Sequence, residues 1–118
     1  GRISLAMKYS KLCKMLNNDN NIIIIVIISM FKEIYEWNRN NLTDYFEVYL
    51  KVPVEELRRR DTKGIYFRFN SGEIKNVAGL DLKIDEPKES NILFEYCDNL
   101  SVDDMSKKVI KKSLIYNI

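Results

Sequence analysis

Apolar residues recur at helical spacing at the start of the chain and then form one unbroken run. Residues 2–17 alternate large apolar and basic side chains with a helical period, which predicts an amphipathic helix. Residues 17–21 are all Asn or Asp, whose short polar side chains favour turns, so we expect the helix to end there. Ile22–Ile28 then contains only Ile and Val, without alternation. This pattern is typical of a parallel strand that is buried on both faces.

The rest of the chain alternates between helical and extended patterns. Residues 62–87 hold three of the four glycines and lack a long apolar period, so they predict loops with a short helix. Ser101 is a good N-cap for the last helix. In chain order we expect a helix over 30–40, a strand over 46–52, a helix over 53–60, a strand over 91–96 and a helix from 101 onward. Such alternation predicts one α/β domain, layered around a mostly parallel sheet.

Composition narrows the classes of function that remain. The chain has 118 residues, 31% of them charged, and a net charge of +2, which is too small to indicate nucleic acid as a partner. It has no histidine, which excludes imidazole bases and histidine metal sites, and we predict no metal site. Cys13 and Cys97 lack metal-ligand spacing and predict buried thiols. The Ile22–Ile28 run is too short to span a bilayer, and no signal peptide is evident, so we expect a cytoplasmic protein without a membrane partner.

A basic segment with glycines lies between the strands expected over 46–52 and 91–96. It comprises Arg60–Tyr66 (RDTKGIY) and Gly72–Asp81 (GEIKNVAGLD). Together with Ile27–Ser29, with Phe46–Tyr49 (FEVY) before Pro53, and with Glu86-Pro87, these segments occur in the order and at the spacing found in the adenylylsulfate kinases. The chain resembles that family from Arg2 to about Leu114. The family phosphorylates the 3′-hydroxyl of adenosine 5′-phosphosulfate with ATP. The resemblance implies a P-loop kinase with a three-layer α/β fold and a lid over about residues 62–87.

The resemblance also implies roles for individual residues. Ile28 and Ser29 match the carboxyl end of a strand at the acceptor pocket, where open α/β sheets place ligands. Lys63 matches a lid lysine that contacts the acceptor, and Arg60 matches the arginine that flanks the adenine of ATP. The lid segment that closes over the acceptor corresponds to Lys75, Asn76 and Val77. The expected ligands are ATP with Mg²⁺ and adenylylsulfate or a related nucleotide, and family members often form homodimers. The residues alone leave Asp61 open between a ligand role and a structural one, in pairing or capping.

The resemblance covers only the later two-thirds of the family domain. No Gly-x-x-x-x-Gly-Lys-Ser/Thr phosphate loop occurs in these 118 residues. The resemblance places that loop, the first strand and the catalytic residues before Gly1, so we expect a partial kinase domain that lacks measurable activity by itself. The absent first strand would lie between Ile22–Ile28 and residues 46–52. We therefore expect these two strands either to close the gap or to leave apolar faces exposed.

The family pattern and this chain differ at several lid positions. Family members usually have an aromatic residue at position 77 that stacks on the acceptor adenine, and Val77 cannot stack. Thr62 replaces the usual proline, and Phe67-Arg68 replaces a basic pair. The segment around Ile28–Phe31 is similar to a bacterial branch of the family, some members of which act on cytidine nucleotides in capsule synthesis. The sequence therefore leaves three possibilities: an adenylylsulfate kinase, a kinase for another nucleotide-linked metabolite, and a non-catalytic relative that binds a nucleotide or a partner.

Overall fold

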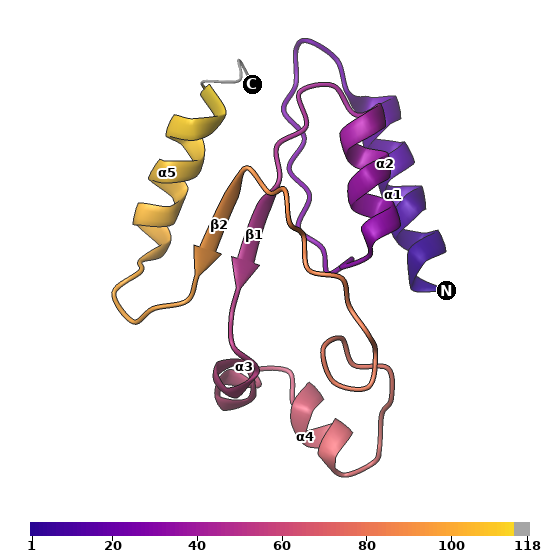
Figure 1. The fold of residues 1–118 in the computed structure, drawn as a ribbon, viewed down its shortest axis with the longest axis vertical. Helices are drawn as coiled ribbons and strands as arrows, with labels where there is room; N and C mark the ends of the chain where they lie inside the picture. Colours follow the sequence, from indigo (N-terminus) through magenta and orange to yellow (C-terminus); the bar gives the residue numbers. More distant parts are fainter. Residues whose placement is uncertain (115–118) are drawn as a thin grey trace.

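The computed structural model describes residues 1–114 and shows an α/β arrangement around a parallel pair of strands (Figure 1). Helices α1 and α2 lie side by side on one side of the two strands, and α5 lies on the other. Helices α3 and α4 lie beyond the carboxyl ends of the strands. The elements are α1 (Arg2–Leu16), α2 (Lys32–Asn41), β1 (Val48–Lys51), α3 (Val54–Arg60), α4 (Ile65–Asn70), β2 (Ile92–Glu95) and α5 (Val102–Leu114). Within residues 1–114, no helix is long and apolar enough to cross a membrane.

The α/β class with a parallel sheet is confirmed. Strands β1 and β2 pair in parallel, with Val48 opposite Ile92 and Lys51 opposite Glu95. Ile92 and Phe94 are buried on one face of β2, whereas Leu93 between them is exposed, as the alternation of strand side chains requires. The Nζ of Lys108 on α5 lies 5.6 Å from the centre of the Phe94 ring, so α5 covers this face.

Helices α1 and α2 pack through small and branched side chains. Ala6 and Ser10 of α1 are buried, and Ile34 of α2 is only 1% exposed. Small side chains on α1 allow the two helix axes to approach closely, and Ile34 fills the resulting contact. The segment predicted as a lid, residues 62–87, returns to the start of α2 in this helix pair, where Asp85 contacts Met30 and Lys32.

The strand predicted over Ile22–Ile28 is wrong for this structure. The segment is extended but belongs to no strand, and Ile24 is 83% and Val26 90% exposed. A strand needs a neighbouring backbone to accept and donate its ladder hydrogen bonds, and the sheet described within residues 1–114 consists of β1 and β2. Of the two outcomes that we expected, the gap between this segment and β1 stays open and the apolar side chains are exposed.

A buried carboxylate connects α2 to the starts of both strands. Glu47, which is 8% exposed, accepts hydrogen bonds from the Tyr45 hydroxyl at 2.7 Å and the Ser90 hydroxyl at 2.8 Å. Its Oε2 also lies 3.5 Å from Nη2 of Arg39, and the same guanidinium pairs with the exposed Glu89 at 3.1 Å. Buried charges are tolerated when they are paired and hydrogen-bonded, so this cluster fixes how the α2 side meets the sheet.

Candidate functional site

The first half of the predicted lid, residues 62–87, is organised by Asp61, which directly precedes it. Its Oδ1 accepts the backbone N–H of Tyr66 and its Oδ2 accepts that of Phe67, both at 3.0 Å. These are N–H groups of the first turn of α4, which have no partner inside the helix. Gly64 precedes α4 with a φ of 65°, a conformation that glycine adopts without steric cost. The structure therefore gives Asp61 the structural role, as the carboxylate that caps the lid turn.

The second half of the lid contains a compact turn, the 76–82 loop, which is closed by Asp81. The two oxygens of Asp81 accept the N–H groups of Asn76 at 2.9 Å and of Val77 at 2.7 Å. These hydrogen bonds, with the Asn76 amide first, hold the pKa of the Asp81 carboxyl below its usual range. Asn76 has a φ of 60°, in the left-handed region that asparagine tolerates better than most residues. The N–H of Gly79 bonds to the carbonyl of Leu82 at 3.1 Å and completes the turn.

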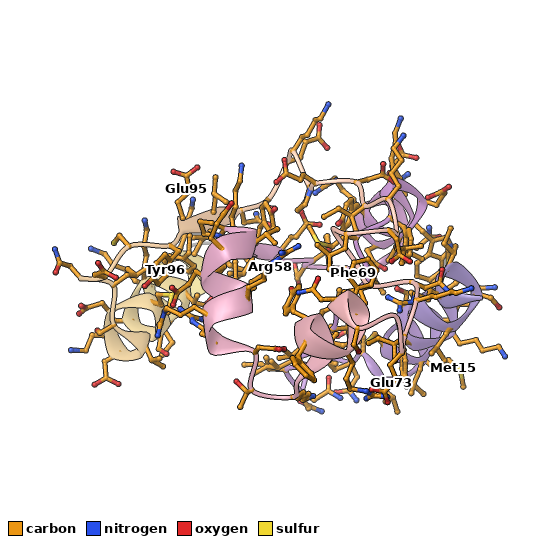
Figure 2. All side chains as sticks on the ribbon, turned by 90° about the horizontal axis from the view of Figure 1, so that it is seen from below. Met15, Arg58, Phe69, Glu73, Glu95 and Tyr96 are labelled. Carbon is orange, nitrogen blue, oxygen red and sulfur yellow. The ribbon has the colours of Figure 1, made fainter. Side chains whose placement is uncertain are left out.

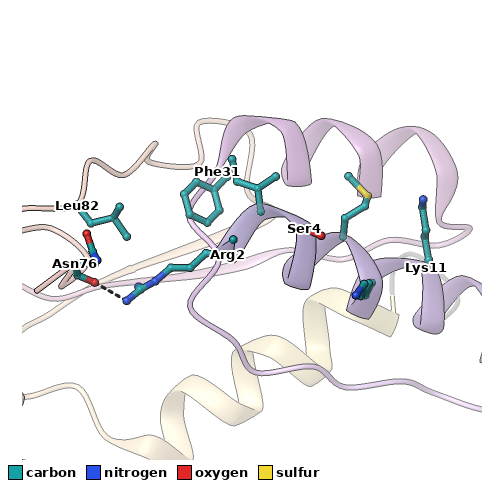
Figure 3. A pocket seen from close by; sticks show the side chains of 10 residues that line it. Arg2, Ser4, Lys11, Phe31, Asn76 and Leu82 are labelled. Atoms are coloured by element: carbon teal, nitrogen blue, oxygen red, sulfur yellow. Dashed lines mark hydrogen bonds between the residues drawn. The ribbon is translucent and has the colours of Figure 1, made fainter.

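Arg2 at the start of α1 connects this loop to the helix pair. Its guanidinium donates a hydrogen bond to the backbone carbonyl oxygen of Asn76 (Figure 3). Arg2 also lines two cavities. The larger, of about 840 Å³, includes Phe31 and Asn76, and the smaller, of about 240 Å³, includes Ile28 and Ser29. The structure thus brings three of the residues predicted to bind the acceptor around one arginine that the sequence did not single out.

The larger cavity is an open hollow whose mainly apolar lining carries three basic side chains and one aromatic ring. Arg2, Lys8 and Lys11 line it along α1, and no Asp or Glu is among its lining residues. Phe31 is the aromatic side chain of the lining, and Figure 3 shows it beside Arg2 at the start of α1, on the side toward Leu82. Cationic side chains attract phosphate groups, and an aromatic ring offers a stacking surface for a base.

The other predicted site residues lie elsewhere. Arg60, Lys63, Lys75 and Val77 line neither of these cavities, so Arg60 and Lys63 share neither of them with Asn76. Lys63 and Lys75 are exposed, and Val77 is 9% exposed.

Arg60 lies at the carboxyl end of the strands, next to the residue that follows β2. Its guanidinium carbon lies 5.1 Å from the centre of the Tyr96 ring, and its Nε lies 2.9 Å from Glu56. Figure 2 shows α3 and α4 from below, with Tyr96 on one side of α3 and Phe69 and Glu73 marking α4 and the turn after it. Stacking on Tyr96 and pairing with Glu56 hold the planar guanidinium in place, as expected for an arginine that presents a flat face.

The end of the lid is fixed to the start of α2. Asp85 donates its N–H to the Met30 carbonyl at 2.8 Å and accepts the N–H of Lys32 through its side chain at 3.1 Å. The hydroxyl of Tyr35 donates to the Asp85 carbonyl at 2.8 Å. Burial, followed by the nearby Glu47, raises the pKa of Tyr35, so this phenol stays a hydrogen-bond donor. These contacts fix Asp85 at Met30 and at the first turn of α2.

Within residues 1–114, no group of His, Cys, Asp or Glu side chains is arranged to hold a metal ion. Cys13 and Cys97 are free thiols, and the expectation that both are buried is wrong, because Cys13 is only half-buried and Cys97 is exposed. Cys97 follows Tyr96 beyond the end of β2, where the chain turns toward α5 and leaves the apolar core.

Comparison with known proteins shows to which family the chain belongs. The sequence profile of the adenylylsulphate kinase family matches residues 1–95. The chain is 38% identical over 112 residues to a cytidine diphosphoramidate kinase from Campylobacter jejuni, covering 95% of this chain and 65% of that protein. It is 33% identical over 98 residues to an adenylyl-sulfate kinase from Picosynechococcus, covering 83% of this chain and 55% of that protein.

A solved structure agrees with the sequence comparisons. The Mycobacterium tuberculosis APS kinase CysC, in complex with AMPPNP and APS, superposes with a TM-score of 0.84 at 25% identity. The match covers 94% of this chain and 65% of that chain. This chain thus spans between 55% and 65% of the length of these relatives. On sequence and fold together, the chain belongs to the adenylylsulfate kinase family.

Proposed function

We propose that the protein is a kinase that transfers the γ-phosphoryl group of ATP to a hydroxyl group of cytidine diphosphoramidate. The observation that carries this choice of acceptor is the 38% identity to a cytidine diphosphoramidate kinase over 95% of the chain, against 33% over 83% for the Picosynechococcus adenylyl-sulfate kinase. Both relatives bear the name of a kinase that acts on a nucleotide-linked metabolite. The family therefore supports the reaction type, and the difference in identity favours the cytidine acceptor.

The side chain at position 77 supports the same choice. The side chain of Val77 is buried and aliphatic, so it offers no ring on which a base could stack. Its backbone N–H is held by Asp81. A purine acceptor would therefore lose the aromatic partner that the family resemblance places at this position. The smaller pyrimidine has less ring area to stack and depends less on such a partner.

Phosphoryl transfer depends mainly on positioning and on neutralising charge, which suits the basic residues of this chain. We propose that Arg60 flanks the adenine of ATP, and that Lys63 and Lys75 reach the acceptor when the lid closes over it. Arg2, Ile28, Ser29 and Asn76 would line the acceptor side. Mg²⁺ would arrive with the phosphates of ATP. The described residues offer no carboxylate cluster for it, so we assign it no step here.

Adenylylsulfate is the second candidate acceptor. It is favoured by the structural likeness to the Mycobacterium tuberculosis APS kinase, whose solved complex contains APS. The proposal places the loop that carries residue 77 over the acceptor, whichever of the two nucleotides it is. One substitution at this position therefore discriminates between the two acceptors. Val77→Phe restores a stacking ring and should shift preference toward the purine acceptor.

A thermal-shift panel on the full-length protein tests the proposal. A ligand that binds only the native state raises the melting temperature by mass action. We expect cytidine diphosphoramidate to raise it more than adenylylsulfate at equal concentration, and Val77→Phe to narrow or reverse this difference. A shift with adenylylsulfate and none with the cytidine compound would contradict the choice of acceptor. Shifts without any product in the presence of ATP would indicate a non-catalytic relative.

A further inference from the structure

The peptide group between Asn76 and Val77 is held at both ends by charged side chains. Its carbonyl oxygen accepts a hydrogen bond from the Arg2 guanidinium, and its N–H donates to Oδ1 of Asp81 at 2.7 Å. The preceding N–H, that of Asn76, donates to the other oxygen of Asp81 at 2.9 Å. Hydrogen bonds to ionised groups are stronger than those between neutral groups. The peptide therefore bridges an arginine and an aspartate that belong to segments far apart in the sequence.

This clamp, which Arg2 and Asp81 form on the peptide between Asn76 and Val77, includes an unfavourable backbone conformation that a simple turn would avoid. Asn76 adopts a φ of 60°, and left-handed backbone is unfavourable for residues other than glycine. Glycine nevertheless occurs in the same loop only at position 79, whose φ is 83°. The retained side chain of Asn76 lines the larger cavity together with Arg2 and Phe31. The strained residue is thus the one that presents a polar side chain to the cavity (Figure 3).

We infer that Arg2 and Asp81 are positioning residues, which hold the 76–82 loop against α1 so that Asn76 and Phe31 face a bound acceptor nucleotide. The inference rests on the proposed function for the identity of the acceptor, but the clamp itself is a property of the lid. Arg2 acts at both cavities, since it also lines the smaller one beside Ile28 and Ser29. Asp81 acts on the acceptor only through the two amides that it holds.

Charge on the surrounding groups is consistent with this role. Lys8 and Lys11 line the same cavity on α1 and leave Arg2 as the cation that contacts Asn76. The positive charge of Arg2 contributes, after the two amides, to holding the pKa of Asp81 below its usual range. Asp81 therefore stays ionised at neutral pH and remains an acceptor for both amides.

The test compares Asp81→Ala, the milder Asp81→Asn and Arg2→Met with the control Glu73→Ala in the full-length protein. Glu73 is an exposed carboxylate of the same lid that pairs with Arg68 at 3.1 Å, outside the clamp. Amide hydrogen exchange is measured at Asn76 and Val77, with and without each acceptor nucleotide, and KM is measured for acceptor and for ATP. Loss of two charge-assisted bonds should speed exchange at these amides by about tenfold or more in Asp81→Ala.

A positioning role predicts a split between the two substrates. The KM for the acceptor should rise by about tenfold in Asp81→Ala and Arg2→Met, while the KM for ATP stays unchanged, because a misplaced loop weakens only the site that it lines. Asp81→Asn keeps one acceptor oxygen and should fall between the wild type and Asp81→Ala. Glu73→Ala should leave both KM values unchanged. The clamp also predicts that a bound acceptor slows exchange at Val77, whereas ADP alone does not.

Several results would overturn the inference. Unchanged exchange at Asn76 and Val77 in Asp81→Ala would show that the clamp does not hold the loop. An equal rise in both KM values, or an unchanged KM for the acceptor, would reduce Arg2 and Asp81 to structural residues. If neither candidate acceptor is phosphorylated, the proposed function fails. The exchange rates of the variants, and the protection of Val77 by each nucleotide, then still decide whether the clamp positions a ligand.

Discussion

Removing the buried carboxylate of Glu47 should destabilise the protein far more than removing the exposed carboxylate of Glu89, although both pair with Arg39. Glu47→Ala leaves the Tyr45 and Ser90 hydroxyls without their acceptor and removes the buried one of the two carboxylates that pair with the half-buried Arg39 guanidinium. Breaking a buried pair from one side costs about 3–5 kcal/mol. The exposed pair of Glu89 with Arg39 contributes about 0.2–1 kcal/mol. The predicted difference between the two variants is therefore about 3 kcal/mol.

Urea denaturation of the full-length protein measures this difference. Trp37, two positions before Arg39 on α2, is the only tryptophan of the 118 residues and reports on this region by its fluorescence. Arg39→Met alone and combined with Glu47→Ala completes a double-mutant cycle, in which the two changes should be non-additive by about 0.5–3 kcal/mol. Equal losses in Glu47→Ala and Glu89→Ala would refute the reasoning, as would a loss below about 1 kcal/mol for Glu47→Ala.

Three further predictions follow from the core, the tyrosines and the length of the chain. Ile34→Ala should lower the free energy of unfolding by about 2–5 kcal/mol, whereas Ile110→Ala, at a 60% exposed position, should change it by less than about 0.5 kcal/mol in the same urea assay. Burial, and next the hydrogen bond to Glu47, raise the pKa of Tyr45 above its ordinary value of 10. The contribution of Tyr45 to the free energy of unfolding should therefore be fully present below pH 10 and fall above it, because the unfolded phenol ionises while the folded one keeps its proton. Absorbance at 295 nm would contradict this if every tyrosine titrated near pH 10. A polypeptide of residues 1–118 alone should show no ATP-dependent phosphorylation of either acceptor, since it contains no phosphate loop, and any such turnover would disprove this.

Local patterns predicted the helices and the two paired strands well. The helix expected over 2–17 is α1 over Arg2–Leu16, and the strand expected over 91–96 is β2 over Ile92–Glu95. These elements depend on periodicity, capping residues and proline, all of which lie within a few positions of one another. The strand prediction for Ile22–Ile28 was wrong because a strand also depends on residues far away in the sequence. These residues have strong strand propensity, but a strand exists only when a neighbouring backbone completes its hydrogen bonds.

The candidate site was predictable only in part. Ile28, Ser29 and Asn76 were predicted through their family context, and the structure places each of them in a cavity that Arg2 also lines. Arg2 itself was missed because its partner Asn76 is 74 positions away in the sequence, and a basic residue at the start of a helix carries no signal of such a contact. The hydrogen bonds of Asp81 with the amides of Asn76 and Val77 could have been anticipated, since Asp side chains often bond to nearby backbone N–H groups in turns.

The most direct test of the account is the ratio of kcat/KM for cytidine diphosphoramidate to that for adenylylsulfate, measured with ATP on the full-length protein. The account predicts a ratio well above one, and a lower ratio for Val77→Phe. A ratio below one in the wild type would show that the protein acts as an adenylylsulfate kinase. It would also contradict the acceptor assigned from Val77 and from the Campylobacter jejuni relative.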